Sequence, residues 1–258
     1  MYMSEKLKAS LCMTVRNEQG SIETLMDSLL NQSRTPDEVF VVDGGSSDRT
    51  LQLLQVYHVR YPHVKVVSAP HANIAAGRNL SIGHAQHDTV ATADAGMEYP
   101  PTWLDNLLRP FEADSAVDVV LGFYAPKSCT LFEKCVGEML YPKKNLIDWE
   151  KFLPSCGSVA FKKRVWGELG GFAEWLPGGI AEDTLFSFGL EKWATDSRML
   201  LKRLVIGAHG KIIGRFLSNG FFTPEEVQLV GLIQRGSTHG LQAIAISVGS
   251  SKKVSSCI

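Results

Sequence analysis

Three aspartates stand at positions where an acid could take part in chemistry: Asp43, Asp94 and Asp183. Asp43 follows the apolar, β-prone run Val39–Val42, and two glycines come directly after it. Asp94 follows a second such run, Val90–Ala93, and a glycine stands two residues later. Ligands of open α/β sheets bind at the carboxyl ends of strands. Acids at two strand ends of one sheet therefore predict a ligand site more strongly than either acid does alone.

The two strand-end acids favour different chemistry. The Asp43 carboxylate is an acceptor suited to a base or a ribose, and the glycines after it, Gly44 first, would let a ligand approach the backbone. The Asp94 carboxylate can hold a hard cation through its oxygen atoms. The plainer interpretation of both segments is a turn that caps the next helix.

Asp183 belongs to a different pattern. It follows Glu182 at the start of a helical segment whose apolar side carries Leu185, Phe186 and Leu190. Acids at the start of a helix are common because they interact favourably with the helix dipole and with the free N–H groups there. A catalytic role for Asp183 has to be weighed against that structural explanation.

Strands and helices that alternate along the chain must position these acids. We expect strands at Ser10–Val15, Val39–Val42, Val64–Ser68, Thr89–Ala93 and Val117–Leu121. We expect helices between them at Ser21–Asn31, Thr50–Tyr61, Ile74–Ala85 and Thr102–Phe111. This alternation predicts a mainly parallel sheet with helices on both faces. The sequence contains no glycine-rich dinucleotide fingerprint and no P-loop.

Beyond Pro126 the pattern is less regular. We expect a helix at Leu131–Leu140, a strand at Ser158–Phe161 and a short helix at Arg164–Leu169. Glycines and prolines between Trp175 and Ala181 predict a loop before the helix that Glu182 begins.

The composition is that of a globular protein with one main domain: 258 residues, of which 45% are hydrophobic and 21% charged. The net charge of −1 argues against a nucleic-acid partner held through its phosphates. The five cysteines show neither metal-ligand spacing nor an even disulfide framework, which favours a reducing compartment. No apolar run resembles a signal peptide or is long enough to span a membrane, so we expect a cytoplasmic location.

Several segments, in their order and spacing, resemble the inverting, nucleotide-sugar-dependent family 2 glycosyltransferases. They are CMTVRNE (12–18), VVDGGSSDRT (41–50), AAGRNLSI (75–82), DAGMEYPPTWL (94–104), GSVAFKKRVWGELGGF (157–172) and AEDTLF (181–186). The resemblance covers residues 8–192 and implies the GT-A fold. That fold is α/β, a Rossmann-like three-layer sandwich with a mainly parallel sheet.

The resemblance also implies a donor-binding set. Thr14, Arg16 and Glu18 match the loop that lies against the nucleoside. Asp43, with Gly44 beside it, matches the acid that contacts the base or the ribose. A nucleotide sugar is therefore the expected donor.

The same resemblance implies roles for three further residues, at the donor diphosphate and at the acceptor. Arg78 matches the basic residue near the diphosphate, and Asp94 matches the first acid of a D-x-D metal motif, with Mg²⁺ or Mn²⁺ as the expected cofactor. Gly96 stands where the second acid would be, so the metal would have one protein ligand fewer, and Glu98 is a candidate helper. Asp183 matches the general base, which an acceptor hydroxyl needs.

The implied activity is metal-assisted, inverting sugar transfer to a glycan, lipid or small-molecule acceptor, as in cell-envelope or polysaccharide biosynthesis. Peripheral association with the cytoplasmic face of a membrane stays open. One alternative is an inactive nucleotide-binding or scaffold relative, which Gly96 favours. A sugar nucleotidyltransferase would need a glycine-rich basic loop after the first strand, and Val15–Glu18 lacks one.

The sequence divides into a GT-A domain at residues 1–192 and a tail at residues 193–258 without the family's later motifs. A shifted reading frame would take the last base of each codon together with the first two bases of the next codon. In that frame the possible codons can encode much of the missing family pattern. Trp193-Ala194 then gives Gly, and Gly207–Lys211 permits Trp-Arg-Pro-Arg-Lys. We therefore expect a frame shift near Lys192 and a poorly packed tail, with a divergent native tail as the alternative.

Overall fold

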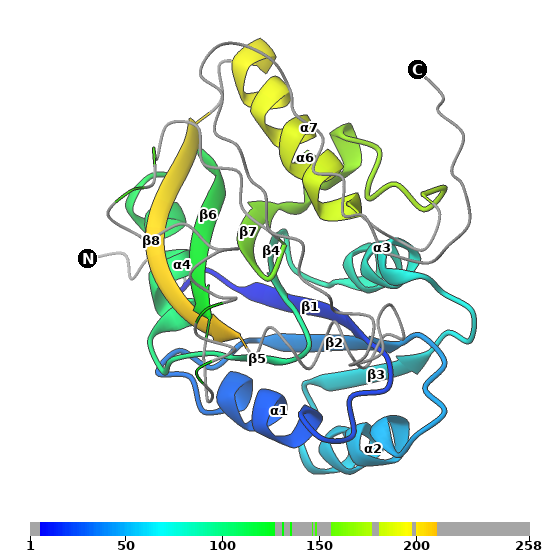
Figure 1. Ribbon diagram of the computed structural model, residues 1–258. Coiled ribbons are helices and arrows are strands. Elements are labelled where there is room, and N and C mark those ends of the chain that lie inside the picture. Colours follow the sequence, from blue (N-terminus) through cyan, green and yellow to red (C-terminus); the bar gives the residue numbers. More distant parts are fainter. Residues whose placement is uncertain are drawn as a thin grey trace. The chain divides into compact units, whose positions relative to one another are not determined.

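The computed structural model describes residues 6–126, 131, 135, 146, 148, 156–176, 181–197 and 200–210. In these residues an eight-stranded mixed sheet runs in the order β3-β2-β1-β4-β7-β6-β8-β5 (Figure 1). The strands are β1 (Ala9–Val15), β2 (Glu38–Asp43), β3 (Val64–Ser68), β4 (Thr89–Ala93), β5 (Met97–Glu98), β6 (Val117–Pro126), β7 (Ser158–Lys162) and β8 (Leu200–Gly210).

Strands β3, β2, β1 and β4 form a parallel half of the sheet. Val15 pairs with Asp43, and Asp43 pairs with Ser68, so the carboxyl ends of β1, β2 and β3 lie at one edge. Every residue of β1 and β2 is buried, because helices cover both faces of this half. The loops that follow β1 and β2 are consequently neighbours.

Strand β7 brings a later part of the chain to the same edge. It runs antiparallel to both β4 and β6, and Ala93 at the end of β4 pairs with Ser158 at the start of β7. Cys156 and Gly157, which precede β7, therefore lie close to the end of β4. On the far side of β6, β8 is parallel to β6 and carries the short strand β5 at its other edge.

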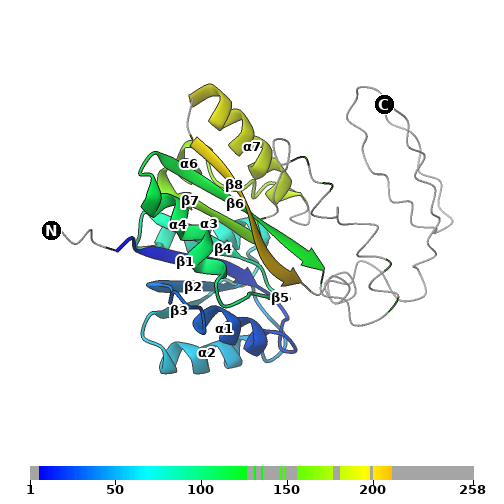
Figure 2. The same ribbon diagram turned by 90° about the vertical axis from the view of Figure 1, so that its left-hand side faces the viewer.

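Helices cover both faces of the sheet, which gives three layers (Figures 1 and 2). The helices are α1 (Ile22–Leu30), α2 (Thr50–Arg60), α3 (Ile74–His84), α4 (Trp103–Ala113), α6 (Lys163–Glu168) and α7 (Glu182–Ser197). One apolar cluster contains Leu25 of α1, Leu54 of α2 and Leu107 of α4. A second contains Ile82 of α3 and Phe186 of α7.

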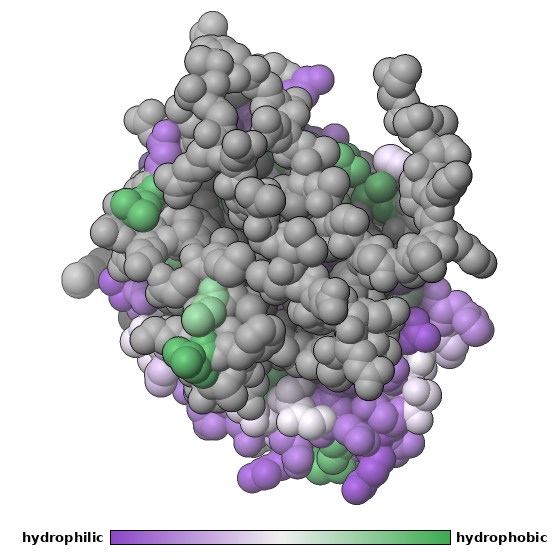
Figure 3. Space-filling model, in the orientation of Figure 1, coloured by the Kyte–Doolittle hydropathy of each residue, from purple (hydrophilic) through white to green (hydrophobic). Residues whose placement is uncertain are grey.

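The outer surface over α1 and α2 is mostly hydrophilic (Figure 3). Val56 and Val59 on α2 are exceptions, since both are exposed. In the described parts of the chain, no helix is both long and apolar enough to cross a membrane.

The predicted α/β architecture is confirmed. The expected strands from Ser10 to Leu121 and the helices between them are all present, with helix ends within two residues of those predicted. The strand at Ser158–Phe161 and the short helix after it are present as well. The predicted helix at Leu131–Leu140 lies, apart from two positions, outside the described residues.

Two strands were not predicted. β5 is very short, and β8 belongs to the segment from residue 193 onward, where we expected a poorly packed tail. The backbone of β8 pairs with β6 from Val117 to Pro126, whereas residues 211–258 lie outside the described residues. The origin of this segment stays a prediction.

Candidate active site

The loops after β1 and β2 are joined by hydrogen bonds at the carboxyl edge of the sheet. The Asn17 N–H donates to the Ser46 hydroxyl at 2.9 Å, and the Ser47 N–H donates to the Asn17 side-chain oxygen at 2.8 Å. The Glu18 N–H donates to the Thr50 hydroxyl at 2.7 Å. These contacts fix the two loops relative to each other.

Asp43 organises the turn that follows it. Asp43 is 1% exposed, and its carboxylate accepts hydrogen bonds from the Gly45 N–H at 3.1 Å, from the Ser46 N–H at 3.0 Å and from the Ser46 hydroxyl. A Cβ atom on Gly44 would lie 3.0 Å from the Ala72 carbonyl oxygen. Close packing against the Ala72 carbonyl therefore explains the glycine at position 44. The role of Asp43 in nucleoside binding stays a prediction.

The predicted residues of the first loop differ in exposure. Thr14 is buried and its hydroxyl donates to the Val42 carbonyl at 3.2 Å. Its side chain is packed so closely against α3 that a Cβ atom on Gly77 would overlap Thr14 Oγ1. Arg16 is exposed and Glu18 is half-buried, so these two side chains can reach a ligand at the surface.

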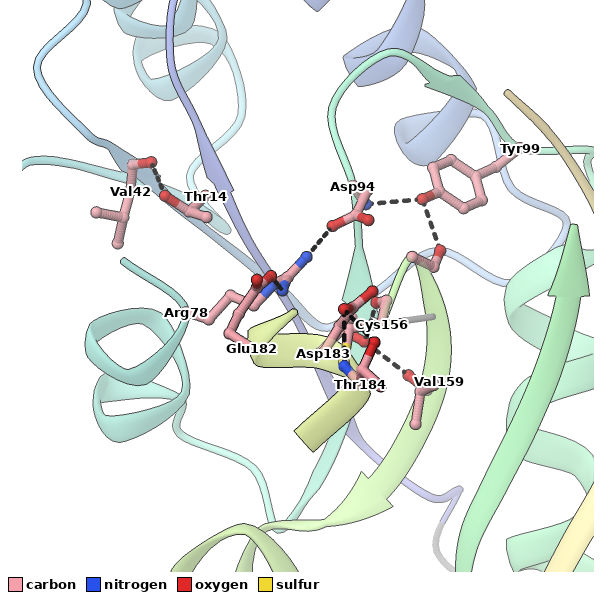
Figure 4. Close-up of polar contacts among 12 residues, drawn as sticks. Thr14, Val42, Arg78, Asp94, Tyr99, Cys156, Val159, Glu182, Asp183 and Thr184 are labelled. Carbon is pink, nitrogen blue, oxygen red and sulfur yellow. Dashed lines mark hydrogen bonds and ion pairs between the residues drawn. The ribbon is translucent and has the colours of Figure 1, made fainter. Parts of the chain in front are cut away.

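Arg78, Asp94 and Glu182 form a buried ionic cluster that three separate elements supply (Figure 4). Arg78 lies on α3, Asp94 directly follows β4, and Glu182 is the first residue of α7. Arg78 Nη2 lies 2.5 Å from Asp94 Oδ1, and Arg78 Nη1 contacts Glu182 Oε1. The exposed fractions of the three residues are 2%, 4% and 5%. The sequence predicted Arg78 and Asp94 as site residues but gave Glu182 no role.

Burial and charge set the protonation of this cluster. Burial alone would lower the pKa of Arg78, but Asp94 and Glu182 outweigh that effect and raise it above its ordinary value. Burial raises the pKa of Glu182; Arg78 opposes the rise and Asp183 adds to it. Burial also raises the pKa of the Cys156 thiol well above its ordinary value. Arg78 is thus a permanent cation, and Cys156 is a thiol rather than a nucleophilic thiolate.

Tyr99 holds the backbone beside Asp94. Its hydroxyl accepts a hydrogen bond from the Asp94 N–H at 2.9 Å and donates one to the Gly157 carbonyl at 2.8 Å (Figure 4). The ring of Tyr99 packs against Trp103 with centroids 4.2 Å apart, and the Trp103 indole N–H donates to the Ser158 hydroxyl at 2.9 Å. The end of β4 and the start of β7 are thereby joined.

Asn79 and Phe172 support the other side of Arg78. The Asn79 side-chain oxygen accepts hydrogen bonds from the Phe172 N–H at 2.8 Å and from the Trp166 indole N–H at 3.0 Å. The Phe172 ring stacks on Phe186 of α7 at 4.2 Å, and the Arg78 guanidinium lies 5.4 Å from the Phe172 ring centroid. Both residues occur in the quoted motifs, where their spacing alone gave no sign of this contact.

Asp183 lies beside Glu182 but makes different contacts. It is half-buried, and its carboxylate accepts a hydrogen bond from the Thr184 N–H at 2.7 Å. The preceding residue, Ala181, has a positive φ of 65°, so the chain turns sharply into α7. The structure thus brings Asp183 next to the Arg78–Asp94–Glu182 cluster. The other predicted residues gather at the ends of β1 and β2.

A divalent cation fits this edge only in a site with few protein ligands. Among the described residues, no three His, Cys, Asp or Glu side chains are grouped as a metal site. Asp94 offers a strand-end carboxylate, while Gly96 has a positive φ of 71° and open space around its Cβ position. Magnesium often binds through one or two carboxylates, with water and substrate phosphates as the remaining ligands. Asp94 together with a donor diphosphate meets that description.

The fold is the GT-A fold of glycosyltransferases. It is similar to the UDP complex of Staphylococcus aureus TarS 1–349, with a TM-score of 0.63 and 20% identity over 80% of this chain and 61% of that one. It is equally similar to a mannosyltransferase from Pyrobaculum calidifontis solved with GDP-Man and Mn²⁺. There the TM-score is 0.63 and the identity 20% over 82% of this chain and 59% of that one.

The sequence model of glycosyl transferase family 2 matches residues 10–165, and the chain belongs to this family. It is 31% identical over 154 residues to an undecaprenyl-phosphate 4-deoxy-4-formamido-L-arabinose transferase of Yersinia enterocolitica, covering 54% of this chain and 44% of the relative. It is 25% identical over 157 residues to the cholesterol galactosyltransferase of Borreliella burgdorferi, covering 61% and 41%. The chain thus spans less than half the length of these relatives.

Proposed function

We propose that the chain transfers a sugar from a nucleotide-sugar donor to an acceptor hydroxyl by metal-assisted, inverting displacement. The observation that carries this proposal is the juxtaposition of Asp94, Arg78 and the Glu182-Asp183 pair at the carboxyl edge of the sheet. Membership of glycosyl transferase family 2 supports the proposal. The structurally similar proteins also support it, since they include complexes with UDP and with GDP-Man.

The donor nucleoside lies over the ends of β1 and β2 in this proposal. Arg16 and Glu18 can reach it from the surface, and Asp43 and Thr14 shape the floor beneath. The hydrogen bonds between the two loops hold this floor in place, which lowers the ordering needed when the donor binds.

The diphosphate lies toward the end of β4, where Asp94 would hold Mg²⁺ or Mn²⁺. When bound, such a cation stabilises the negative charge that develops on the leaving nucleoside diphosphate. Tyr99 fixes the backbone of Asp94, and Arg78 fixes its carboxylate. Asp94 thus needs no rearrangement of its own backbone to bind the cation.

Asp183 is the proposed general base. It removes the proton of the acceptor hydroxyl while the acceptor oxygen forms a bond to the anomeric carbon of the sugar. The bond from that carbon to the diphosphate oxygen breaks, and the nucleoside diphosphate leaves with the electron pair. This displacement inverts the anomeric centre and needs no protein nucleophile.

The acceptor in this proposal is a lipid or a growing glycan. Two relatives are named for transfer to cholesterol or undecaprenyl phosphate, and two are the chondroitin and hyaluronan synthases of Pasteurella multocida. These names support lipids and growing glycans as candidate acceptors in envelope or polysaccharide biosynthesis. Peripheral membrane association belongs to the same proposal.

A second candidate function is nucleotide binding without transfer. Gly96 favours it, because the site lacks the second carboxylate of a D-x-D motif. Release of nucleoside diphosphate from UDP- and GDP-sugars in the presence of Mn²⁺ distinguishes the two. We expect release above background that Asp183→Asn greatly reduces, whereas donor binding without any release would support the non-catalytic function.

A further inference from the structure

The Arg78 guanidinium connects two acids from distant parts of the sequence. Asp94 is 16 residues away and Glu182 is 104 residues away, and each takes one terminal nitrogen of Arg78. The exposed side-chain fractions are 3% for Arg78 and 6% for each acid. Water therefore screens these charges little, and a change in one is felt by the others.

Arg78 is also held from a third direction. Its guanidinium faces the Phe172 ring, which stacks on Phe186 one turn into α7. Asn79, the next residue of α3, bonds the Phe172 backbone through its side-chain oxygen at 2.8 Å. The guanidinium is thus fixed between the end of β4 and the start of α7.

The division of the Arg78 charge determines how much negative charge Asp94 presents to a cation. With Glu182 ionised and in contact, the single positive charge of Arg78 is shared by two carboxylates. Without the charge of Glu182, all of it would act on Asp94 and weaken the attraction of Asp94 for a divalent cation.

We propose that Glu182 is a positioning residue that shares Arg78 with Asp94, keeps Asp94 able to bind a divalent cation, and links that binding to the first turn of α7. This inference rests on the proposed function, because it assigns Asp94 to the cation. The linkage is reciprocal: cation and diphosphate on Asp94 release Arg78 toward Glu182 and tighten the turn that carries Asp183.

Calorimetric titration of UDP and GDP, with and without Mg²⁺, tests the first part of the inference. In the wild-type chain we expect Mg²⁺ to raise the affinity for the nucleoside diphosphate. In Glu182→Gln, which keeps the shape and an acceptor oxygen, we expect that gain to fall about tenfold, within the usual range of coupling between sites. Affinity without Mg²⁺ should be unchanged, whereas a purely structural defect would lower both affinities.

Glu191→Gln is the matched control, because it removes the same charge from α7 nine residues further along the helix. We expect it to keep the full gain from Mg²⁺. A folded Glu182→Gln chain with the wild-type gain would overturn the inference.

Hydrogen exchange of the unaltered chain tests the linkage without any substitution. We expect the amides of the first turn of α7, residues 182–185, to exchange more slowly with UDP or GDP and Mg²⁺ together than with the nucleotide alone. Equal exchange in both conditions would contradict the linkage even if Glu182→Gln failed to fold. A wild-type chain that binds neither nucleoside diphosphate would contradict the proposed function itself, and the inference would fall with it.

Discussion

At the scale of single residues, the capping and catalytic explanations of Asp183 predict different effects of the same substitution. Asn keeps the size of Asp and caps helices about equally well, so Asp183→Asn should leave the stability unchanged. Asn cannot take the proton from the hydroxyl of the acceptor substrate, so sugar transfer should slow by roughly 10²–10⁴-fold. Steady-state kinetics and thermal unfolding of the same preparations measure the two effects.

The affinity for the donor nucleotide distinguishes a variant that has lost only the general base from one whose whole site is damaged. The dissociation constant of the nucleoside diphosphate should be the same in Asp183→Asn and the wild-type chain. Wild-type turnover in the variant would remove Asp183 as the base and leave it as a helix cap.

Asp43 has a structural role, because its carboxylate accepts the hydrogen bonds that shape the turn after β2. Asp43→Ala would remove the acceptor of the partly buried N–H groups of Gly45 and Ser46, and each hydrogen bond lost is worth about 1 kcal/mol. We expect a lower midpoint of urea unfolding as well as weaker nucleotide binding. Asp43→Asn keeps one acceptor oxygen and should be less destabilised. If Asp43→Ala were as stable as the wild-type chain, this structural role would be wrong.

At the scale of elements, sequence patterns predicted the strands and helices that depend on short-range periodicity. The buried apolar runs of β1 and β2 and the amphipathic periodicity of α1 are visible within ten residues of sequence. The antiparallel direction of β7 is not, because it depends on pairing with β4, from Thr89↔Lys162 to Ala93↔Ser158, far earlier in the chain. The Arg78–Glu182 contact was missed for the same reason, since no periodicity reports an ion pair across 104 residues.

The packing of α3 against β1 gives a test at this scale. In the interior of a helix, Gly77→Ala should stabilise by about 1 kcal/mol through helix propensity alone. Here the added Cβ would overlap Thr14, so we expect a net loss of about 1–3 kcal/mol in the free energy of unfolding. Gly83→Ala is the control on the same helix, because its nearest contact is a Trp166 ring atom at 4.0 Å. Urea unfolding should show the opposite sign for the two variants; equal effects would show that α3 can move away from β1.

At the scale of the whole molecule, the chain covers 44% or less of the length of the two relatives compared above. We propose that its sequence leaves the family's reading frame near Lys192. Trp193 is nonetheless buried, and its indole N–H donates to the Glu168 carboxylate at 2.6 Å. That contact favours the alternative, in which the sequence is native at least as far as Trp193. A direct test distinguishes a frame shift from a native tail.

Nucleotide sequencing across codons 190–215 provides that test, together with expression of a chain in which the frame is restored. We expect the restored chain to be more soluble and more active than the 258-residue chain. An intact frame in independent reads, or equal solubility and activity of the two chains, would establish residues 193–258 as a genuine part of the protein.

Above all, we propose that the carboxyl edge of the sheet binds a nucleoside diphosphate through a cation on Asp94. The most direct measurement is the affinity for UDP and GDP, with and without Mg²⁺ or Mn²⁺, in the wild-type chain and in Asp94→Asn. Because Asn lacks the charge that attracts the cation but keeps the shape of Asp, we expect the metal-dependent gain in diphosphate affinity to disappear while affinity for the free nucleoside persists. A folded Asp94→Asn chain whose diphosphate affinity still rises with metal as in the wild type would contradict it.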